Sequence, residues 1–248
     1  MTTFSGWQLD IFNSWIDAGH FRRGGLHDVG FWDICSLKAK LIPSIQFIDG
    51  LGKSVFTLSI SIASLSFGAL LGSTIHPFLP IVAPPRRAVQ YTITSLSILT
   101  YGAVVVVYFL LSVNYRHEVT ASLLFAFPGT LTRYILAVRF NTLLKSLPLG
   151  TLLANSIGTA LLASFVALQS KANPVSANAC SLLQGLMDGY CGCLTTVSTF
   201  VVEIYAMPLQ KGFRYTLLSW VLGQILFVTI LGSPIWSGHA NKQMTCLF

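Results

Sequence analysis

The chain has 248 residues, of which 53% are hydrophobic and only 9% are charged, and its formal net charge is +7. A soluble domain normally carries about 25% charged residues, so this composition excludes an ordinary soluble protein and indicates a chain that crosses a membrane several times. The basic residues are scattered among short loops, which argues against nucleic acid as a partner and makes the lipid bilayer the expected one.

The chain begins with an amphipathic stretch, residues 2–15, that is too short to cross a bilayer. We interpret it as the second half of a broken membrane helix. For the long segment between Gly19 and Leu51 we expect an extracellular loop with a short helix. Apolar stretches long enough to cross roughly 30 Å of hydrocarbon follow. They lie at 54–75, 90–113, 119–139, 147–169, 179–207 and 213–234.

Basic residues in the loops predict how these spans are oriented. On one side of the membrane the loops hold Arg86, Arg87, Arg139, Lys145, Lys211 and Arg214. On the other side they hold Arg116, Lys171 and Lys242. Positively charged loops stay in the cytosol, so we place the richer side there. The C-terminus and the segment before residue 54 then face outside.

The stretch 179–207 is longer than the others because it contains a predicted helix break, GYCGCLTTVSTFVVE at 189–203. Gly189 and Gly192 are poor helix formers. Hydroxyl groups follow at Thr195, Thr196, Ser198 and Thr199. Unwound backbone at membrane depth is tolerated only inside the protein or beside water, and in transporters its freed carbonyls bind ions. The sequence therefore predicts an ion site at this break.

The start of the chain repeats the second half of this motif. Residues 2–10, TTFSGWQLD, align with residues 195–203, TTVSTFVVE. The chain thus carries two copies of one element, and the first copy lacks its front half. An acid stands at the same place in both, Asp10 and Glu203. We expect it to hold the broken helix through backbone or arginine, with a place near the membrane surface as the alternative.

Further polar and aromatic residues inside the spans suggest an anion path. Arg133 lies mid-span, where it is expected to meet water or an anion; an interfacial anchor is the alternative. Thr151, Asn155 and Gly158 share one helix face. The Asn155 amide can donate to an anion or form an interhelical hydrogen bond. The ring edges of Phe4 and Phe200 are electropositive, although plain packing is their ordinary role.

Three strings together resemble the Fluc (CrcB-like) fluoride channel family. They are PGTLTRY at 128–134, PLGTLLANSIGTALLA at 148–163 and GYCGCLTTVSTFVVE at 189–203. They match the family's Gly and Arg on one span, its G-T-x-x-x-N on the next, and its G-x-x-T-T-F-S-T-F break on the third. The resemblance covers about 119–236, while residues 1–75 resemble the tail of a preceding copy and 90–113 the extra helix of fungal-type two-domain exporters.

The resemblance implies an all-α polytopic membrane protein with an antiparallel pair of four-helix units, an inverted repeat joined by an extra helix. Residues 1–84 would be the C-terminal remnant of the first unit, 85–117 the linking helix, and 118–248 a complete second unit. The first unit is then incomplete, and we expect the chain to be N-terminally truncated, as a short isoform or fragment. Self-association could supply the missing half.

The resemblance also implies passive fluoride export through a multi-pass plasma-membrane channel. Its fluoride path would be lined by Asn155, Thr151, Phe200, Phe4, Ser198 and Arg133. Backbone at Gly192, Thr195 and Thr196 would hold a structural Na⁺, and Glu203 and Asp10 would be structural acids. Val197 and Trp7 stand where the family has phenylalanines, which suggests one active and one vestigial path.

Other functions stay open beside this one. A non-conducting fragment of such a channel and a carrier for another small ion are the alternatives. We expect no enzyme, because no nucleotide-binding glycine motif follows a predicted strand. The five cysteines show no metal-binding pattern. Cys191 and Cys193 are interpreted as small apolar fillers beside the break.

Overall fold

The computed structural model describes residues 3–16, 43–78, 86–111, 121–144, 147–171, 176–241 and 246. This part of the chain is helical and contains no strand, only an isolated bridge between Lys171 and Ala240. The long helices are α1 Phe4–Ile16, α3 Pro43–Ile75, α4 Arg87–Leu110, α6 Ala121–Phe140, α7 Leu149–Gln169 and α11 Leu209–Phe227. Five helical segments of the described chain are long and apolar enough to cross a membrane. The expected all-α polytopic membrane fold is confirmed.

The predicted spans match the observed helices to within a few residues, except at the start of α3. This helix begins at Pro43, whereas the apolar stretch suggested residue 54. Asp49 and Lys53 made the preceding segment look like a loop, but they pair one helical turn apart with 3.1 Å between Oδ2 and Nζ. Such a pair supports a helix. Of the segment 19–51, where we expected a loop with a short helix, residues 19–42 fall outside the described residues and residues 43–51 belong to α3.

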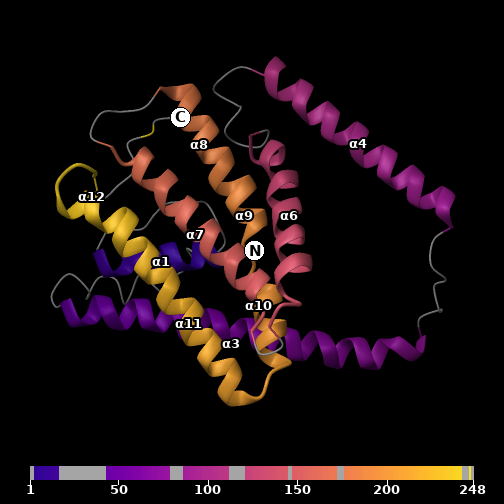
Figure 1. Ribbon diagram of the computed structural model, residues 1–248, viewed down its shortest axis with the longest axis horizontal. Coiled ribbons are helices and arrows are strands. Elements are labelled where there is room, and N and C mark those ends of the chain that lie inside the picture. Colours follow the sequence, from indigo (N-terminus) through magenta and orange to yellow (C-terminus); the bar gives the residue numbers. More distant parts are fainter. Residues whose placement is uncertain are drawn as a thin grey trace.

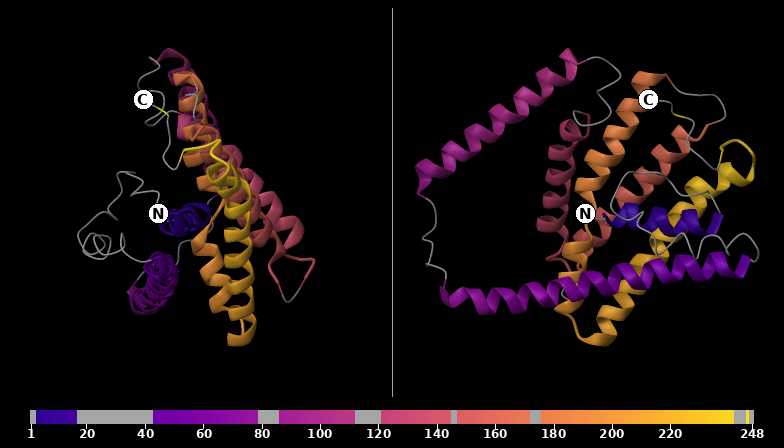
Figure 2. Two further views of the ribbon diagram at one scale, coloured as in Figure 1. Left: turned by 90° about the vertical axis from the view of Figure 1, so that its left-hand side faces the viewer. Right: turned by 180° about the vertical axis from the view of Figure 1, so that it is seen from behind.

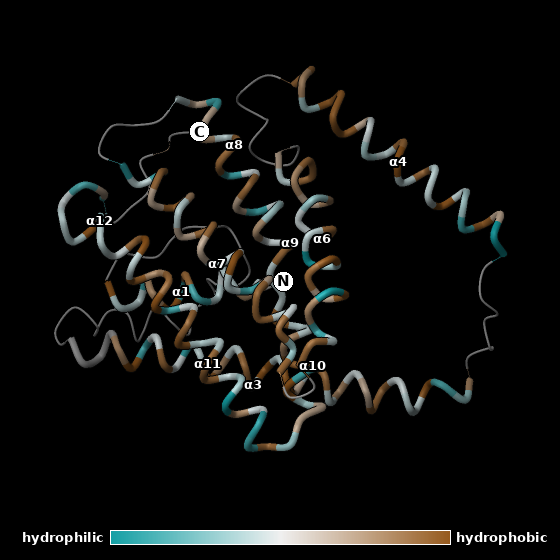
Figure 3. Tube along the Cα trace, viewed as in Figure 1, coloured by the Kyte–Doolittle hydropathy of each residue, from teal (hydrophilic) through white to brown (hydrophobic). Residues whose placement is uncertain are grey.

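Figure 1 shows a bundle formed by α6, α7, the broken helix and α11, with α1 and α3 side by side across it. Two further views agree, and they show α4 standing apart (Figure 2). Helix α4 meets α6, where the Tyr101 hydroxyl donates to the Leu124 carbonyl at 3.0 Å. None of its residues is buried, and apolar residues occupy much of its length (Figure 3). Such a helix suits lipid on most of its sides.

The broken helix consists of short pieces. Helix α8 (Ala177–Gly185) passes through a π-helical turn, η4 (Leu186–Cys191), into the single turn α9 (Gly192–Leu194). Two extended residues follow, Thr195 at φ −91°, ψ 148° and Thr196 at φ −149°, ψ 130°. Helix α10 (Val197–Tyr205) then completes the span. The break therefore lies at the two β-branched threonines, which favour extended backbone, and not at the glycines.

The glycines instead bring helices close together. A Cβ atom on Gly189 would collide with the Ser122 carbonyl of α6, and one on Gly185 would lie 2.8 Å from the Ala121 carbonyl carbon. A Cβ on Gly129 would in turn meet the backbone of Tyr190. Helix α6 thus packs backbone against backbone on α8 and η4, as small residues allow in membrane helices.

Helix α11 continues through a second π-helical turn, η5 (Val228–Gly232), into α12 (Ser233–Trp236). Two clusters of buried apolar residues hold α1 against this bundle. In one, Phe12 stacks on Phe227 with ring centroids 5.7 Å apart. In the other, Phe4 and Trp7 pack with residues of α10 and α11. Helix α1 is therefore part of the core and brings its repeat motif to the break.

Candidate functional site

The two copies of the repeat begin their helices in the same way. The Thr196 hydroxyl accepts the backbone N–H of Thr199 at 3.4 Å and caps α10. In the aligned copy, the Thr3 hydroxyl accepts the backbone N–H of Gly6 at 3.1 Å. A threonine that accepts from the third residue of a helix is a standard N-cap. The alignment drawn from sequence thus has a matching local geometry.

The two copies also meet each other. The Thr195 hydroxyl oxygen lies 3.0 Å from Ser5 Oγ and 3.3 Å from the Ser5 backbone N–H. Thr195 donates its own hydrogen to the Cys191 carbonyl at 3.0 Å, so Ser5 is the donor in both other contacts. Phe4 and Phe200 meet edge to face, with centroids 5.4 Å apart. The first residues of α1 and the break in the membrane helix therefore form one buried site.

Asn155 forms a reciprocal pair with the unwound backbone. Its Oδ1 accepts the Thr196 N–H at 2.9 Å, and its Nδ2 donates to the Thr196 carbonyl at 3.3 Å. The side chain thus satisfies the Thr196 backbone N–H and carbonyl, as a neighbouring strand would in a sheet. It is only 1% exposed. One of its two amide hydrogens is left to offer to another acceptor.

The predicted face of α7 is turned toward the broken helix. Thr151 reaches Glu203, Asn155 reaches Thr196, and a Cβ on Gly158 would collide with the Thr195 methyl group. The missing side chain of Gly158 is what lets α7 approach the break.

Glu203 joins three helices. Its Oε1 accepts from the Thr151 hydroxyl of α7 at 2.5 Å, and its Oε2 accepts from the Tyr215 hydroxyl of α11 at 3.0 Å. The partners are thus hydroxyls, whereas backbone or arginine was expected. Asp10, the aligned acid, is exposed, and its backbone carbonyl accepts from Ser14 Oγ at 3.0 Å.

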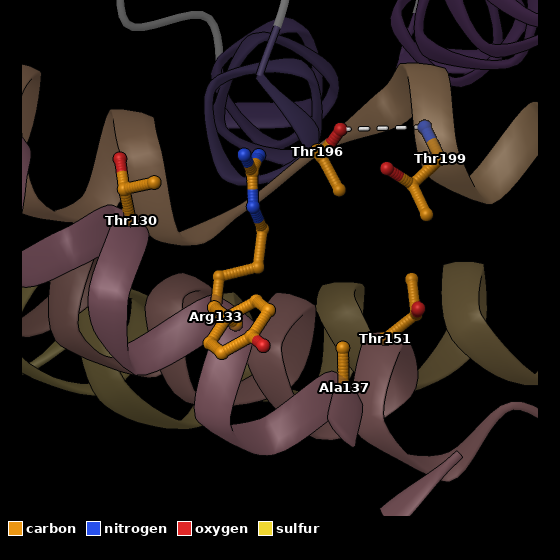
Figure 4. A pocket seen from close by; sticks show the side chains of 7 residues that line it. Thr130, Arg133, Ala137, Thr151, Thr196 and Thr199 are labelled. Atoms are coloured by element: carbon orange, nitrogen blue, oxygen red, sulfur yellow. Dashed lines mark hydrogen bonds between the residues drawn. The ribbon is translucent and has the colours of Figure 1, made fainter. Parts of the chain in front are cut away.

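A pocket of about 230 Å³ opens between α6, α7 and the break. Its lining consists of Thr130, Arg133, Tyr134, Ala137, Thr151, Thr196 and Thr199. Figure 4 shows the Arg133 guanidinium reaching from α6 toward Thr196. Among the described residues, Asp49 and Lys53 form an ion pair, whereas no carboxylate pairs with Arg133. A cation among hydroxyls suits a hydrated anion.

The structure places the remaining predicted residues at different depths. Phe4 and Phe200 are fully buried, and Phe200 also lies 5.0 Å from the Tyr215 ring. Ser198 is exposed, with its Oγ 3.0 Å from the Thr196 hydroxyl. Gly192 sits beside Thr3, whose methyl group would lie 3.8 Å from an added Cβ. The path residues thus surround the break without forming one continuous line.

Sequence reasoning missed a polar seam between α1 and α11. Gln224 donates to the Gln8 carbonyl at 3.1 Å and to its side-chain oxygen, and both residues are buried. In the described part of the chain, Trp7 Nε1 and Ser219 Oγ are buried without a partner. The sequence could have indicated a polar face on this helix, because Tyr215, Ser219 and Gly223 repeat every four residues in an otherwise apolar stretch.

We expect the Thr151–Glu203 bond to stabilise the fold measurably. Hydrogen bonds to a carboxylate contribute about 1.5–3 kcal/mol each. A double-mutant cycle with Thr151→Val and Glu203→Leu should give a coupling of about 1 kcal/mol or more in thermal unfolding. Ser164→Ala, which removes a bond within α7 alone, serves as the control for Thr151→Val. Additive effects of the two changes would contradict the assignment.

Comparisons with known proteins support the motif match. A family model described as CrcB-like protein, Camphor Resistance (CrcB), matches residues 120–233. Fluoride export protein 1 of Candida albicans is 35% identical over 190 residues, which are 72% of this chain and 48% of that protein. Fluoride export protein 1 of Neurospora crassa is 39% identical over 124 residues, 50% of this chain and 24% of that protein.

A bacterial relative is covered more completely. The fluoride-specific ion channel FluC of Pseudomonas aeruginosa is 39% identical over 111 residues, 42% of this chain and 81% of that protein. The chain spans about half the length or less of the fungal relatives. No solved structure matches. Since the aligned region carries the α6, α7 and break motifs and covers most of the bacterial channel, the chain belongs to the CrcB-like family.

Proposed function

We propose that this protein is a channel that lets fluoride leave the cell across the plasma membrane, passively and down its electrochemical gradient. The observation that carries the proposal is the broken membrane helix held by Asn155 beside a pocket that contains Arg133. Relatives named as fluoride export proteins and fluoride-specific channels support fluoride as the anion.

The pocket would be the entrance of the path. Arg133 and the surrounding hydroxyls attract a small hydrated anion and replace part of its water shell. The second amide hydrogen of Asn155 would then donate to the anion at the break. The electropositive ring edges of Phe4 and Phe200 favour a small anion without holding it tightly. Weak successive sites are what conduction requires.

A structural Na⁺ would sit at the break, bound by oxygen atoms, whereas the anion would be bound by hydrogen-bond donors. The Thr196 N–H binds Asn155, so it does not bind the Gly192 carbonyl one turn earlier, as a continuous helix would require. Carbonyls at Gly192, Thr195 and Thr196, and the Ser5 and Thr195 hydroxyls that meet at the break, would offer the oxygen donors that a hard cation prefers. Bound Na⁺ would supply a fixed positive charge that joins the two repeats.

We expect Na⁺ to stabilise the protein. Replacing it with a large organic cation should lower the unfolding midpoint by several degrees, because a ligand that binds only the folded state adds to stability. Fluoride transport should fall in parallel. The measurements are thermal unfolding and fluoride flux at constant ionic strength, with K⁺ as a second cation. If both quantities are indifferent to the cation, the proposed Na⁺ site is wrong.

Fluoride efflux from liposomes tests the function itself. Purified protein is reconstituted in vesicles loaded with fluoride. Efflux is followed with a fluoride electrode once the membrane potential that opposes it has been dissipated. We expect rapid efflux of fluoride and no comparable efflux from vesicles loaded with chloride. Equal loss of both anions, or no loss from protein-containing vesicles, would contradict the proposal. Cross-linking in the same vesicles tests the predicted self-association.

A further inference from the structure

The C-terminal segment folds back over one end of the bundle. After α12 the chain reverses at Gly238, whose φ of 76° is a left-handed conformation that glycine adopts without strain. Ala240 then forms an antiparallel bridge with Lys171, and the Asn241 N–H donates to the Ser170 carbonyl at 2.6 Å. The segment 237–241 therefore lies against the end of α7.

A disulfide extends this contact to the broken helix. Cys246 is bonded to Cys180, which lies in the first turn of α8 and is only 1% exposed. The Gln169 amide of α7 donates to the carbonyl of the same Cys180 at 3.4 Å. The end of α7, the start of α8 and Cys246 are thus joined at one place. Helix α8 leads through η4 and α9 directly into the break.

The position of this disulfide bears on membrane orientation. The bond holds Cys246 at the start of α8, and Figure 1 shows this start at the opposite end of the bundle from the start of α11, which carries Lys211 and Arg214. Basic residues mark the cytosolic end of a span. Disulfides persist in oxidising compartments and are rare in the cytosol. Two unrelated physical signals, loop charge and sulfur oxidation, therefore agree on one orientation.

We propose that the Cys180–Cys246 disulfide lies on the extracytosolic face and that the segment 237–241, together with Cys246, acts as a strap that holds the first half of the broken helix in place. Oxidation of the two thiols releases two protons and two electrons. The electron acceptor would be a disulfide-carrying oxidoreductase of the secretory pathway, which is reduced to a dithiol as it transfers its bond.

Labelling of intact cells tests the orientation. Cells that express the whole chain are treated with a membrane-impermeant phosphine, denatured, and labelled with a maleimide polymer that adds mass at each free thiol. We expect a gain of two labels over untreated cells, and no gain from the variant Cys180→Ser/Cys246→Ser. A gain that appears only after the cells are permeabilised would overturn the extracytosolic assignment. No gain under either condition would overturn the disulfide.

Thermal unfolding tests the strap. The bond closes a loop of 66 residues, and loss of such a crosslink should lower the unfolding midpoint of purified Cys246→Ser by about 5–10 °C. Reductant should lower the wild-type midpoint by the same amount and leave Cys246→Ser unchanged. Equal midpoints for the oxidised wild type and the variant would overturn the strap's role.

A functional arm rests on the proposed fluoride conduction. Because α8 leads into the break, reduction should slow fluoride efflux several-fold in the wild type and have no effect in Cys246→Ser. Absence of efflux from oxidised wild type would count against the proposed function, while labelling and unfolding would still decide the strap. Normal efflux that reduction leaves unchanged would overturn the link between the strap and the break.

Discussion

Asn155→Asp is expected to abolish fluoride efflux from liposomes. The substitution keeps an oxygen that can accept the Thr196 N–H, but it replaces the donor to the Thr196 carbonyl with a negative oxygen. A carboxylate about 4 Å from a passing anion costs roughly 4 kcal/mol at an effective dielectric constant of 20. That cost corresponds to a fall of about a thousandfold in occupancy of the site.

Two further variants separate charge from structure in this experiment. Asn155→Leu removes both bonds to Thr196 without adding charge, so its unfolding midpoint should fall further than that of Asn155→Asp, while efflux is lost in both. Thr159→Val is the matched control, because Thr159 is fully buried one turn away and, among the described residues, its hydroxyl bonds only to the Asn155 backbone carbonyl. Its efflux should stay near wild type. Wild-type efflux from Asn155→Asp would remove Asn155 from the path.

Gly189→Val is expected to have the largest effect on stability. Its Cβ would overlap the Ser122 carbonyl, a backbone atom that cannot turn aside, so α6 and η4 would have to separate. Overpacking of this kind costs about 3 kcal/mol or more, which should lower the unfolding midpoint by roughly 10 °C. Efflux should fall as well, because α6 carries Arg133 and η4 leads into the break.

Gly102→Val provides the control for this prediction. Gly102 lies in α4, which is apolar like the broken span, and a Cβ there meets nothing within 4 Å. We expect its midpoint within a few degrees of wild type. Similar midpoints for the two variants would show that the close approach of α6 and η4 contributes little to stability.

The membrane class, most of the helices and the repeat can be predicted from the amino-acid sequence. Each depends on local order along the chain: the length of an apolar stretch, the helical spacing of Thr151, Asn155 and Gly158, and the threonines that cap α10 and α1. The caps form within four residues, so the aligned strings gave the same geometry in both copies. The start of α3 escaped this reasoning because its charges pair within the helix.

Packing between distant segments sets which residues of the predicted stretch 189–203 leave the helix, and what holds them there. Thr196 leaves the helix where the Asn155 amide, 41 residues away, binds its backbone N–H and carbonyl. Glu203 finds its hydroxyl partners on two other helices, and Cys180 finds Cys246 at the far end of the chain. Glycine content alone pointed to the wrong residues. Hydrogen bonds and disulfides between distant segments depend on which faces pack together, and local pattern does not specify that.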